Sequence, residues 1–115
     1  MVVQQLSQSS QFQQIIQAAG TKAVFVDFFA TWCGPCRAIA PKYEELSNRY
    51  NHAIFLKVDV DNLEDIAQEQ GVSAMPTFMC FKEKQKKEEI RGRKTFLPRG
   101  FTLQNTTPRA SLQFS

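Results

Sequence analysis

The sequence predicts an α/β fold, in which helices flank a central mixed β-sheet. Two segments, residues 23–31 and 53–60, are almost continuously apolar, which is typical of strands covered on both faces in a parallel sheet. The segment between them carries apolar residues at helical spacing, so the three segments form a right-handed βαβ unit. Two later strand-like segments, residues 76–82 and 86–92, flank a polar linker and predict an antiparallel hairpin.

Two further helices are predicted from the signals at their ends, the first of them after a short edge strand over residues 2–6. Each helix begins with a polar residue that has Gln or Glu three positions later, which is the spacing of a capping box. Each ends before a glycine, because glycine readily adopts the left-handed backbone that terminates a helix. These residues are Ser10, Gln13 and Gly20 in the first helix, and Asp61, Glu64 and Gly71 in the second.

The regular pattern ends near residue 93. A chain of 115 residues that is 43% hydrophobic can build the core of one domain and is too short for two. Beyond the hairpin, Pro98, Gly100 and Pro108 interrupt any helix, and no sustained period remains. We therefore expect residues 1–92 to form the domain and residues 93–115 to form a divergent, irregular tail.

The charge is unevenly distributed along the chain. Residues 1–81 carry 5 Lys and Arg against 8 Asp and Glu, whereas residues 82–115 carry 9 against 3. A basic end can favour nucleic acid or acidic partners, but a solvated hairpin and tail explain it better. We adopt the second interpretation and expect no nucleic-acid partner.

The cysteine count and the first residues favour the cytoplasm. Three cysteines allow one internal disulfide and a leftover thiol, which excludes a secreted scaffold held together by several disulfides. The first residues show neither a basic region nor an apolar export signal, and no apolar run approaches the roughly 20 residues that cross a bilayer. We expect a cytoplasmic protein without a membrane segment.

Cys33 and Cys36 lie in the segment FATWCGPCRAIAPKY, directly after the first buried strand. This is the carboxyl end of a strand, where open α/β sheets usually place their sites. Cys33 begins the next helix, whose free N–H groups and dipole stabilise a thiolate. Cys36 faces the same side within disulfide reach, and Pro35 stiffens the turn. Cys33 can therefore attack a target disulfide, and Cys36 can resolve the mixed disulfide.

Zinc binding is the main alternative for the cysteines. Cys33, Cys36, Cys80 and His52 nominally total a Cys₃His set. However, a second compact ligand pair is missing, and about 16 helical residues, or roughly 24 Å, separate His52 from the cysteine pair. We expect no metal and interpret Cys80 as a small hydrophobe in a buried strand. A pair of chemically inert thiols is the third possibility.

Two other residues are unusual for their segments. Asp27 lies inside the apolar run, where desolvation raises the pKa of an unpaired carboxyl group. Pro76 would break a β-ladder in mid-strand, so we expect it at the first residue of its strand. There, the neighbouring backbone can pair with an incoming peptide.

These segments together resemble the thioredoxin family. VDFFATWCGPCRAIAPKYEEL is similar to the family's active-site segment, with a Trp before the first Cys and a Pro five residues after the second. FLKVDVD resembles the family's next strand, AMPTFMCF resembles its cis-proline strand, and Gly92 falls where the family has a glycine. The similarity covers about residues 3–92, whereas residues 93–115 do not resemble the family's closing helix.

The resemblance implies a thioredoxin fold whose closing C-terminal helix is absent or replaced. It implies a thiol-disulfide oxidoreductase that reduces protein disulfides in cell redox homeostasis and needs no bound cofactor. Electrons would come from thioredoxin reductase, which uses NADPH, because this chain has no Gly-rich dinucleotide motif. The alternative is a non-catalytic interaction module of the same fold with an altered C-terminus.

The resemblance also assigns roles to individual residues. Asp27 is implied to shuttle a proton to and from Cys36, with Lys57 on the adjacent strand as its partner. The Met75–Pro76 bond is implied to be cis and to lie across from Cys33. The implied catalytic residues are Cys33, Cys36, Asp27 and Lys57, and the implied substrate-binding residues are Trp32, Gly34, Pro35, Met75, Pro76 and Gly92.

Overall fold

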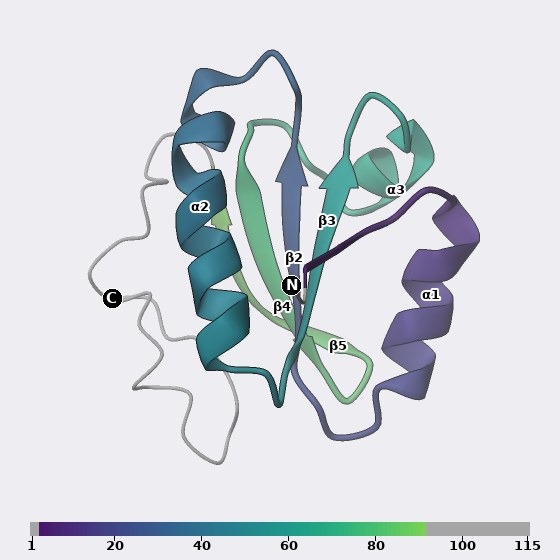
Figure 1. Cartoon of the computed structure of the whole chain (residues 1–115). Helices are drawn as coiled ribbons and strands as arrows, with labels where there is room; N and C mark the ends of the chain where they lie inside the picture. The colour runs from purple at the N-terminus through teal and green to yellow at the C-terminus, as the bar shows by residue number, and fades with distance from the viewer. Residues whose placement is uncertain (1–2, 92–115) are drawn as a thin grey trace.

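Five strands form one mixed sheet, with α2 on one face and α1 and α3 on the other (Figure 1). The computed structural model describes residues 3–91. The elements in chain order are β1 (Val3–Gln5), α1 (Ser9–Ala18), β2 (Val24–Phe29), α2 (Gly34–Arg49), β3 (Ile54–Asp59), α3 (Glu64–Glu69), β4 (Thr77–Lys82) and β5 (Gln85–Arg91).

The strand order is β1-β3-β2-β4-β5. β3 runs parallel to both β1 and β2, whereas β4 is antiparallel to β2 and β5 is antiparallel to β4. The predicted βαβ unit and hairpin are therefore confirmed, and they share one sheet. β2 lies at its centre, so its carboxyl end is flanked by strands on both sides.

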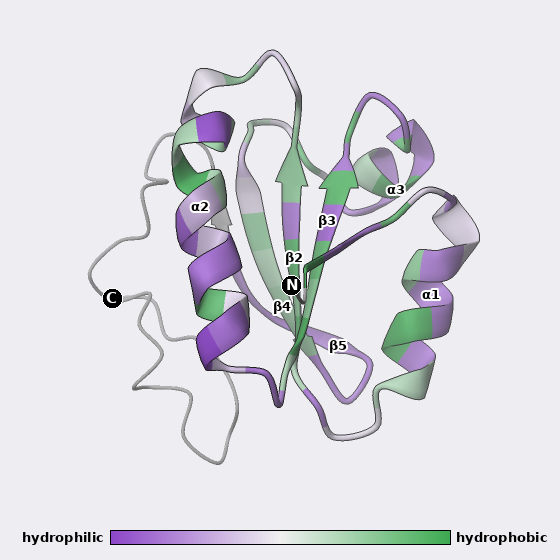
Figure 2. Ribbon diagram, viewed as in Figure 1, coloured by the Kyte–Doolittle hydropathy of each residue, from purple (hydrophilic) through white to green (hydrophobic). Residues whose placement is uncertain are grey.

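The core consists of two layers separated by the sheet. Alternate side chains of a strand point to opposite faces, so Phe25 packs towards α2 while Val24 and Val26 pack towards α1 and α3. In Figure 2 the central strands are hydrophobic along most of their length, as expected for strands covered on both faces. The helices contribute Ile39, Tyr43 and Leu46 to one layer and Phe12, Ile16 and Ile66 to the other.

The predicted helix stops are correct. Gly20 directly follows Ala19, the C-cap residue of α1, and has a φ of 64°. Gly71 follows Gln70, the C-cap residue of α3, and has a φ of 73°. Both angles lie in the left-handed region, which a glycine enters without the steric cost that a side chain adds.

The predicted start of α1 is wrong. The helix begins at Ser9, and Oε1 of Gln11 accepts hydrogen bonds from the backbone N–H groups of Ser7 at 2.8 Å and Gln8 at 3.0 Å. Gln11 therefore reaches back over the helix start, and the expected pairing of Ser10 with Gln13 does not form the cap. Several Ser and Gln residues compete for this role, and their sequence spacing does not distinguish them.

The predicted capping box of α3 is also wrong. The helix begins at Glu64, after Leu63, and no side chain caps it. Instead, the backbone carbonyl of Asp59 accepts hydrogen bonds from the N–H groups of Asn62 at 3.1 Å and Leu63 at 2.9 Å. Asp61 lies in the preceding turn, and its carboxylate has a different partner, which is described below.

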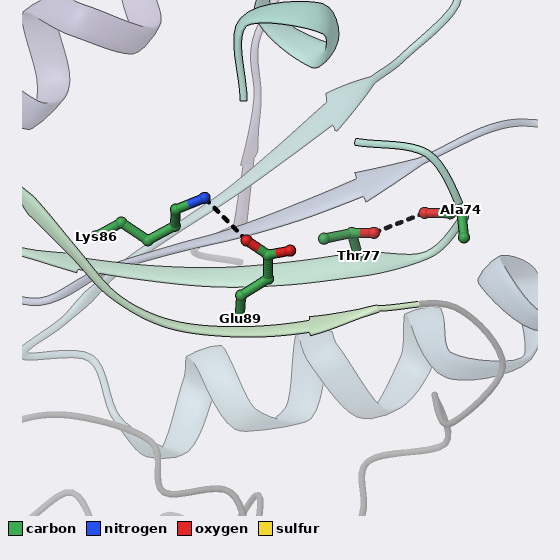
Figure 3. Close-up of polar contacts among 4 residues, drawn as sticks. All are labelled: Ala74, Thr77, Lys86 and Glu89. Atoms are coloured by element: carbon green, nitrogen blue, oxygen red, sulfur yellow. Dashed lines mark hydrogen bonds and ion pairs between the residues drawn. The ribbon is translucent and has the colours of Figure 1, made fainter. Parts of the chain in front are cut away.

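The β4–β5 hairpin turns without a glycine. Glu83 and Lys84 have φ angles of 54° and 69°, so two successive residues with side chains occupy the left-handed region. This conformation costs a non-glycine residue about 1–2 kcal/mol. On β5, the Nζ of Lys86 and Oε1 of Glu89 form an ion pair at 2.8 Å (Figure 3).

The expectations for Gly92 and for the tail over residues 93–115 lie outside the described residues. Within residues 3–91, no helix has the length and apolar character needed to cross a membrane.

Candidate active site

The two cysteines of the CGPC segment lie where β2 gives way to α2. Cys33 caps the helix, and its Sγ accepts a hydrogen bond from the backbone N–H of Cys36 at 3.1 Å. The two residues form a disulfide, with their Cα atoms 5.2 Å apart. The predicted pairing and the position of Cys33 at the helix N-terminus are thus confirmed. Gly34 and Pro35 form the exposed first turn between them.

The segment before β4 faces Cys33. The Met75–Pro76 peptide bond is cis, and the carbonyl oxygen of Met75 lies 3.6 Å from the Sγ of Cys33. Pro76 lies one residue before β4, which begins at Thr77 instead of Pro76 as predicted. The Oγ1 of Thr77 donates a hydrogen bond to the carbonyl of Ala74 at 2.6 Å and so closes the turn that presents Met75 (Figure 3).

Trp32 is the one large apolar side chain that stands out into solvent among the described residues, with 64% of its surface exposed. Its Nε1 donates a hydrogen bond to a carboxylate oxygen of Asp61 at 2.9 Å. The indole is therefore held at one edge while its ring remains open beside Cys33. This role of Asp61 is not predicted from the sequence, although its position after a parallel strand adjacent to β2 is a usable signal.

Asp27 lies in the middle of the central strand with 1% of its surface exposed. Neither of its carboxylate oxygens has a hydrogen-bond partner. Burial raises the pKa of Asp27 from 3.8 to about 7, and the positive charge of Lys57 opposes part of this rise. The desolvation expected from the sequence is present, and it makes the carboxyl group titratable near neutral pH.

Lys57 is the partner of Asp27 in the parallel register of β2 and β3. The two side chains do not hydrogen-bond, because the Asp27 oxygens have no partner. The Lys57 Nζ lies 4.5 Å from the centre of the Phe29 ring, a distance at which a cation is attracted to an aromatic face. Lys57 and Cys36 line the same cleft of about 200 Å³, together with Phe29 and Arg37.

Two further side chains support this site and were not singled out from the sequence. Nη1 of Arg37 donates a hydrogen bond to the carbonyl of Thr31 at 2.7 Å, which ties the first turn of α2 to the loop before it. The buried hydroxyl of Tyr43 donates to the carbonyl of Leu56 at 2.9 Å. Burial, and secondarily the charge of Asp27, raise the pKa of Tyr43 well above its usual value. Tyr43 thus lies near Asp27 but donates its proton elsewhere.

Cys80 is separate from the disulfide. It is buried in β4 and packs in the layer that contains Phe25 and Phe55. Within residues 3–91, no group of three or more His, Cys, Asp or Glu side chains is arranged to hold a metal ion.

Comparison with known proteins identifies this arrangement. A family model described as Thioredoxin matches residues 2–97. The chain belongs to the thioredoxin family. It is 57% identical over 91 residues to Thioredoxin-1 of Schizosaccharomyces pombe, which covers 79% of this chain and 86% of that protein.

Solved structures agree with this assignment. The X-ray structure of Fasciola hepatica thioredoxin has a TM-score of 0.79 and 36% identity, covering 94% of this chain and 99% of that chain. A chain in the crystal structure of a complex of ferredoxin:thioredoxin reductase and thioredoxin f2 has a TM-score of 0.74 and 38% identity, covering 78% of this chain and 82% of that chain. With the redox-active disulfide at Cys33 and Cys36, the protein is a thiol-disulfide oxidoreductase.

Proposed function

We propose that the chain reduces disulfides of protein targets through unequal roles of its two cysteines. The Cys33 thiolate attacks one sulfur of the target disulfide, the target S–S bond breaks, and the second target sulfur leaves as a thiolate. The Cys36 thiolate then attacks the Sγ of Cys33, forms the internal disulfide and releases the first target sulfur. Two electrons pass to the target, and the product on this chain is the Cys33–Cys36 disulfide described above.

The position of Cys33 at the α2 N-terminus is the observation that carries this assignment. Its sulfur accepts the Cys36 N–H and begins a helix whose dipole favours negative charge at that end. It also lies beside the Met75 carbonyl, at the segment where a target backbone can dock. Cys36 lies one turn further along the helix and lines the cleft on the Lys57 side.

Asp27 serves as the proton acceptor for Cys36 in this proposal. The Cys36 thiol must lose a proton before it attacks, and a carboxylate with a pKa of about 7 can take up a proton at neutral pH and release it again. Its unpaired oxygens support this role, because no hydrogen bond fixes the group in its charged form. Lys57 acts on Asp27 through its charge, which lowers the pKa of Asp27 relative to burial alone.

The exposed surface around Cys33 binds the target. The Trp32 indole offers an open aromatic face, and the Met75 carbonyl offers a backbone acceptor for an extended peptide. Gly34 and Pro35 have no long side chains, so they leave room for a target at the start of α2. The proposed target-binding residues are Trp32, Gly34, Pro35, Met75, Pro76 and Gly92.

A reductase regenerates the dithiol. The likeness to a chain in the solved complex of ferredoxin:thioredoxin reductase and thioredoxin f2 supports a reductase as the partner. We propose an NADPH-dependent thioredoxin reductase in the cytoplasm, with no cofactor bound to this chain. Oxidation of NADPH that requires the reductase, this chain and a disulfide substrate together supports the assignment. The assignment is contradicted if the complete mixture oxidises NADPH no faster than the same mixture without this chain.

Reduction of insulin disulfides with dithiothreitol as the electron donor tests the function. We expect Cys33→Ser to abolish turnover and Cys36→Ser to accumulate a mixed disulfide with the target. Cys80→Ala is the matched control, because Cys80 is buried away from the site and its loss leaves turnover intact. Faster labelling of Cys36 than of Cys33 by iodoacetamide in the reduced protein contradicts the assigned roles. Target binding without any turnover favours the interaction module instead.

A further inference from the structure

Asp59 is a buried carboxylate that the proposed mechanism does not use. It is the last residue of β3, the register partner of Phe29 in β2, and 6% of its surface is exposed. A buried carboxylate is costly unless donors reach it. Its Oδ1 accepts the backbone N–H of Asp61 at 2.9 Å, and its Oδ2 lies 3.5 Å from the Nδ2 of Asn62.

These contacts fix the turn that follows β3. The backbone carbonyl of Asp59 accepts two more N–H groups from residues 62 and 63, and the N–H of Val60 donates to the carbonyl of Phe29 at 2.9 Å. Every backbone N–H from residue 60 to residue 63 therefore donates to Asp59 or to β2. This leaves little freedom for the main chain at Asp61.

The Asp61 side chain projects from this turn towards the active-site loop. Its Oδ2 accepts the Nε1–H of Trp32, which directly precedes Cys33 in the chain. The contact is exposed, where a single hydrogen bond does little to order two free side chains. A fixed backbone at Asp61 reduces the entropy lost when the carboxylate meets the indole.

We propose that Asp59 is a positioning residue for target binding, whose buried carboxylate holds the Asp61 backbone so that the Asp61 side chain orients the exposed Trp32 indole beside Cys33. The chain of contacts runs from the Asp59 carboxylate to the Asp61 N–H, and from the Asp61 carboxylate to the Trp32 indole. The inference rests on the proposed role of Trp32 in target binding. Whether Asp59 orients the Trp32 indole through Asp61 does not depend on that role.

The competing explanation is a purely structural turn. Asp59 also precedes α3, so its loss could lower stability without moving the indole. Trp32 is the only tryptophan of the chain, so its indole N–H gives one NMR signal, and the exchange rate of this proton reports directly on the bond to Asp61. A structural role changes the unfolding transition and leaves this rate unchanged in the folded protein.

The experiment compares Asp59→Ala with Asp61→Ala, Asp59→Asn and their double variant. We expect both alanine variants to speed indole exchange and to raise the KM for insulin by about 2- to 10-fold, the factor that one hydrogen bond supplies, with kcat nearly unchanged. The double variant should behave as either single variant, because both break one chain of contacts. Asp59→Asn keeps an acceptor oxygen and should stay within about twofold of the unmodified protein.

Ser9→Ala is the matched control. It removes the hydrogen bond from Ser9 to the Asp65 carboxylate, which links α1 to the start of α3 without touching the turn at Asp61. It should lower stability and leave indole exchange and KM unchanged. If Asp59→Ala does not fold, Asp59→Gln replaces it, since the extra methylene misplaces the acceptor oxygen.

The proposal is overturned if Asp59→Ala, or Asp59→Gln in its place, keeps the indole exchange rate of the unmodified protein, or if the effects of Asp59→Ala and Asp61→Ala add in the double variant. Trp32→Phe separates this failure from that of the target-binding role. An unchanged KM in Trp32→Phe removes Trp32 from target binding. The indole signal of the Asp59 and Asp61 variants, which keep Trp32, still decides whether Asp59 positions the indole.

Discussion

Two buried aspartates lie on neighbouring strands of this protein, in very different surroundings. Asp27 and Asp59 are 1% and 6% exposed, and both belong to the carboxyl halves of parallel strands. Asp27 has no hydrogen-bond donor, and its pKa rises to about 7. Asp59 accepts a backbone N–H at 2.9 Å and organises a turn. Burial alone therefore does not decide what a carboxylate does, because the donors that reach it separate a proton acceptor from a structural anchor.

The largest expected effect concerns the stability cost of Asp27. Its folded-state pKa is raised, so from pH 4 to pH 7 the unfolded chain loses this proton while the folded chain keeps it. The contribution of Asp27 to stability is therefore most favourable at low pH and falls as the pH rises through this window, by about 4 kcal/mol for the shift from 3.8 to about 7. We expect Asp27→Asn to remove this loss.

Urea unfolding of the oxidised proteins between pH 4 and pH 8 measures that difference. The unmodified protein should lose stability relative to Asp27→Asn as the pH rises, and the two curves should run parallel above about pH 8. Curves that are parallel throughout would mean that Asp27 has a similar pKa in the folded and unfolded chains.

The second effect concerns the rate of resolution. Asp27→Asn cannot accept the Cys36 proton, so we expect the release of a mixed disulfide by Cys36 to slow about 100-fold at neutral pH, the lower end for acid–base catalysis. Stopped-flow measurement of target release after mixed-disulfide formation follows this step. Attack by Cys33 on the target should change little and serves as the internal reference. An unchanged pH profile for resolution would assign the proton to another group.

The third effect has the opposite sign from the first. Asp59→Ala leaves the Asp61 N–H without its acceptor and loosens the turn before α3, so we expect a loss of about 1–3 kcal/mol in the free energy of unfolding at pH 7. Urea unfolding measures it beside Asp27→Asn under the same conditions. A gain in stability from Asp59→Ala would show that the two aspartates are alike.

The sequence predicted Asp27 better than Asp59. A lone carboxylate in an apolar run can be recognised without any structure, because the run predicts a strand covered on both faces and hence a desolvated side chain. Asp59 also lies in an apolar strand, but its role depends on the backbone of the following turn. The bond from Asp61 to Trp32 joins two loops that are distant in the chain. Sequence spacing does not encode such contacts, and the spacing of Asp61 and Glu64 predicts a helix cap instead.

The fold followed from the sequence more closely than the helix starts did. Continuous apolar runs determine buried strands, and glycines at positive φ determine the stops of α1 and α3. The start of α1 depends on which of several polar side chains accepts the first free backbone N–H groups. Gln11 accepts the N–H of Gln8, whereas the sequence predicts a capping box of Ser10 and Gln13. The Lys57 register followed from the family resemblance, whereas its position over Phe29 required the structure.

A small change in stability that does not depend on pH provides a reference for the pH-dependent effect of Asp27→Asn. Lys84→Gly should relieve one left-handed residue in the β4–β5 turn and stabilise the protein by about 1 kcal/mol. This gain arises from backbone strain, so it should be equal at pH 4 and pH 8, unlike the effect of Asp27→Asn. Thermal unfolding at both pH values measures it. A gain that varies with pH would point to the lost lysine charge instead of the backbone.

A carbon-13 NMR titration of the Asp27 carboxyl carbon in the oxidised protein measures the folded-state pKa of this group directly. We expect a midpoint near pH 7, since the carboxyl group is buried without a hydrogen-bond donor. Lys57→Met should move that midpoint further upward, because the positive charge that opposes desolvation is lost. A midpoint near the ordinary value of 3.8 would contradict this role, because the Asp27 carboxylate would then be too weak a base to take up the proton of Cys36 at neutral pH.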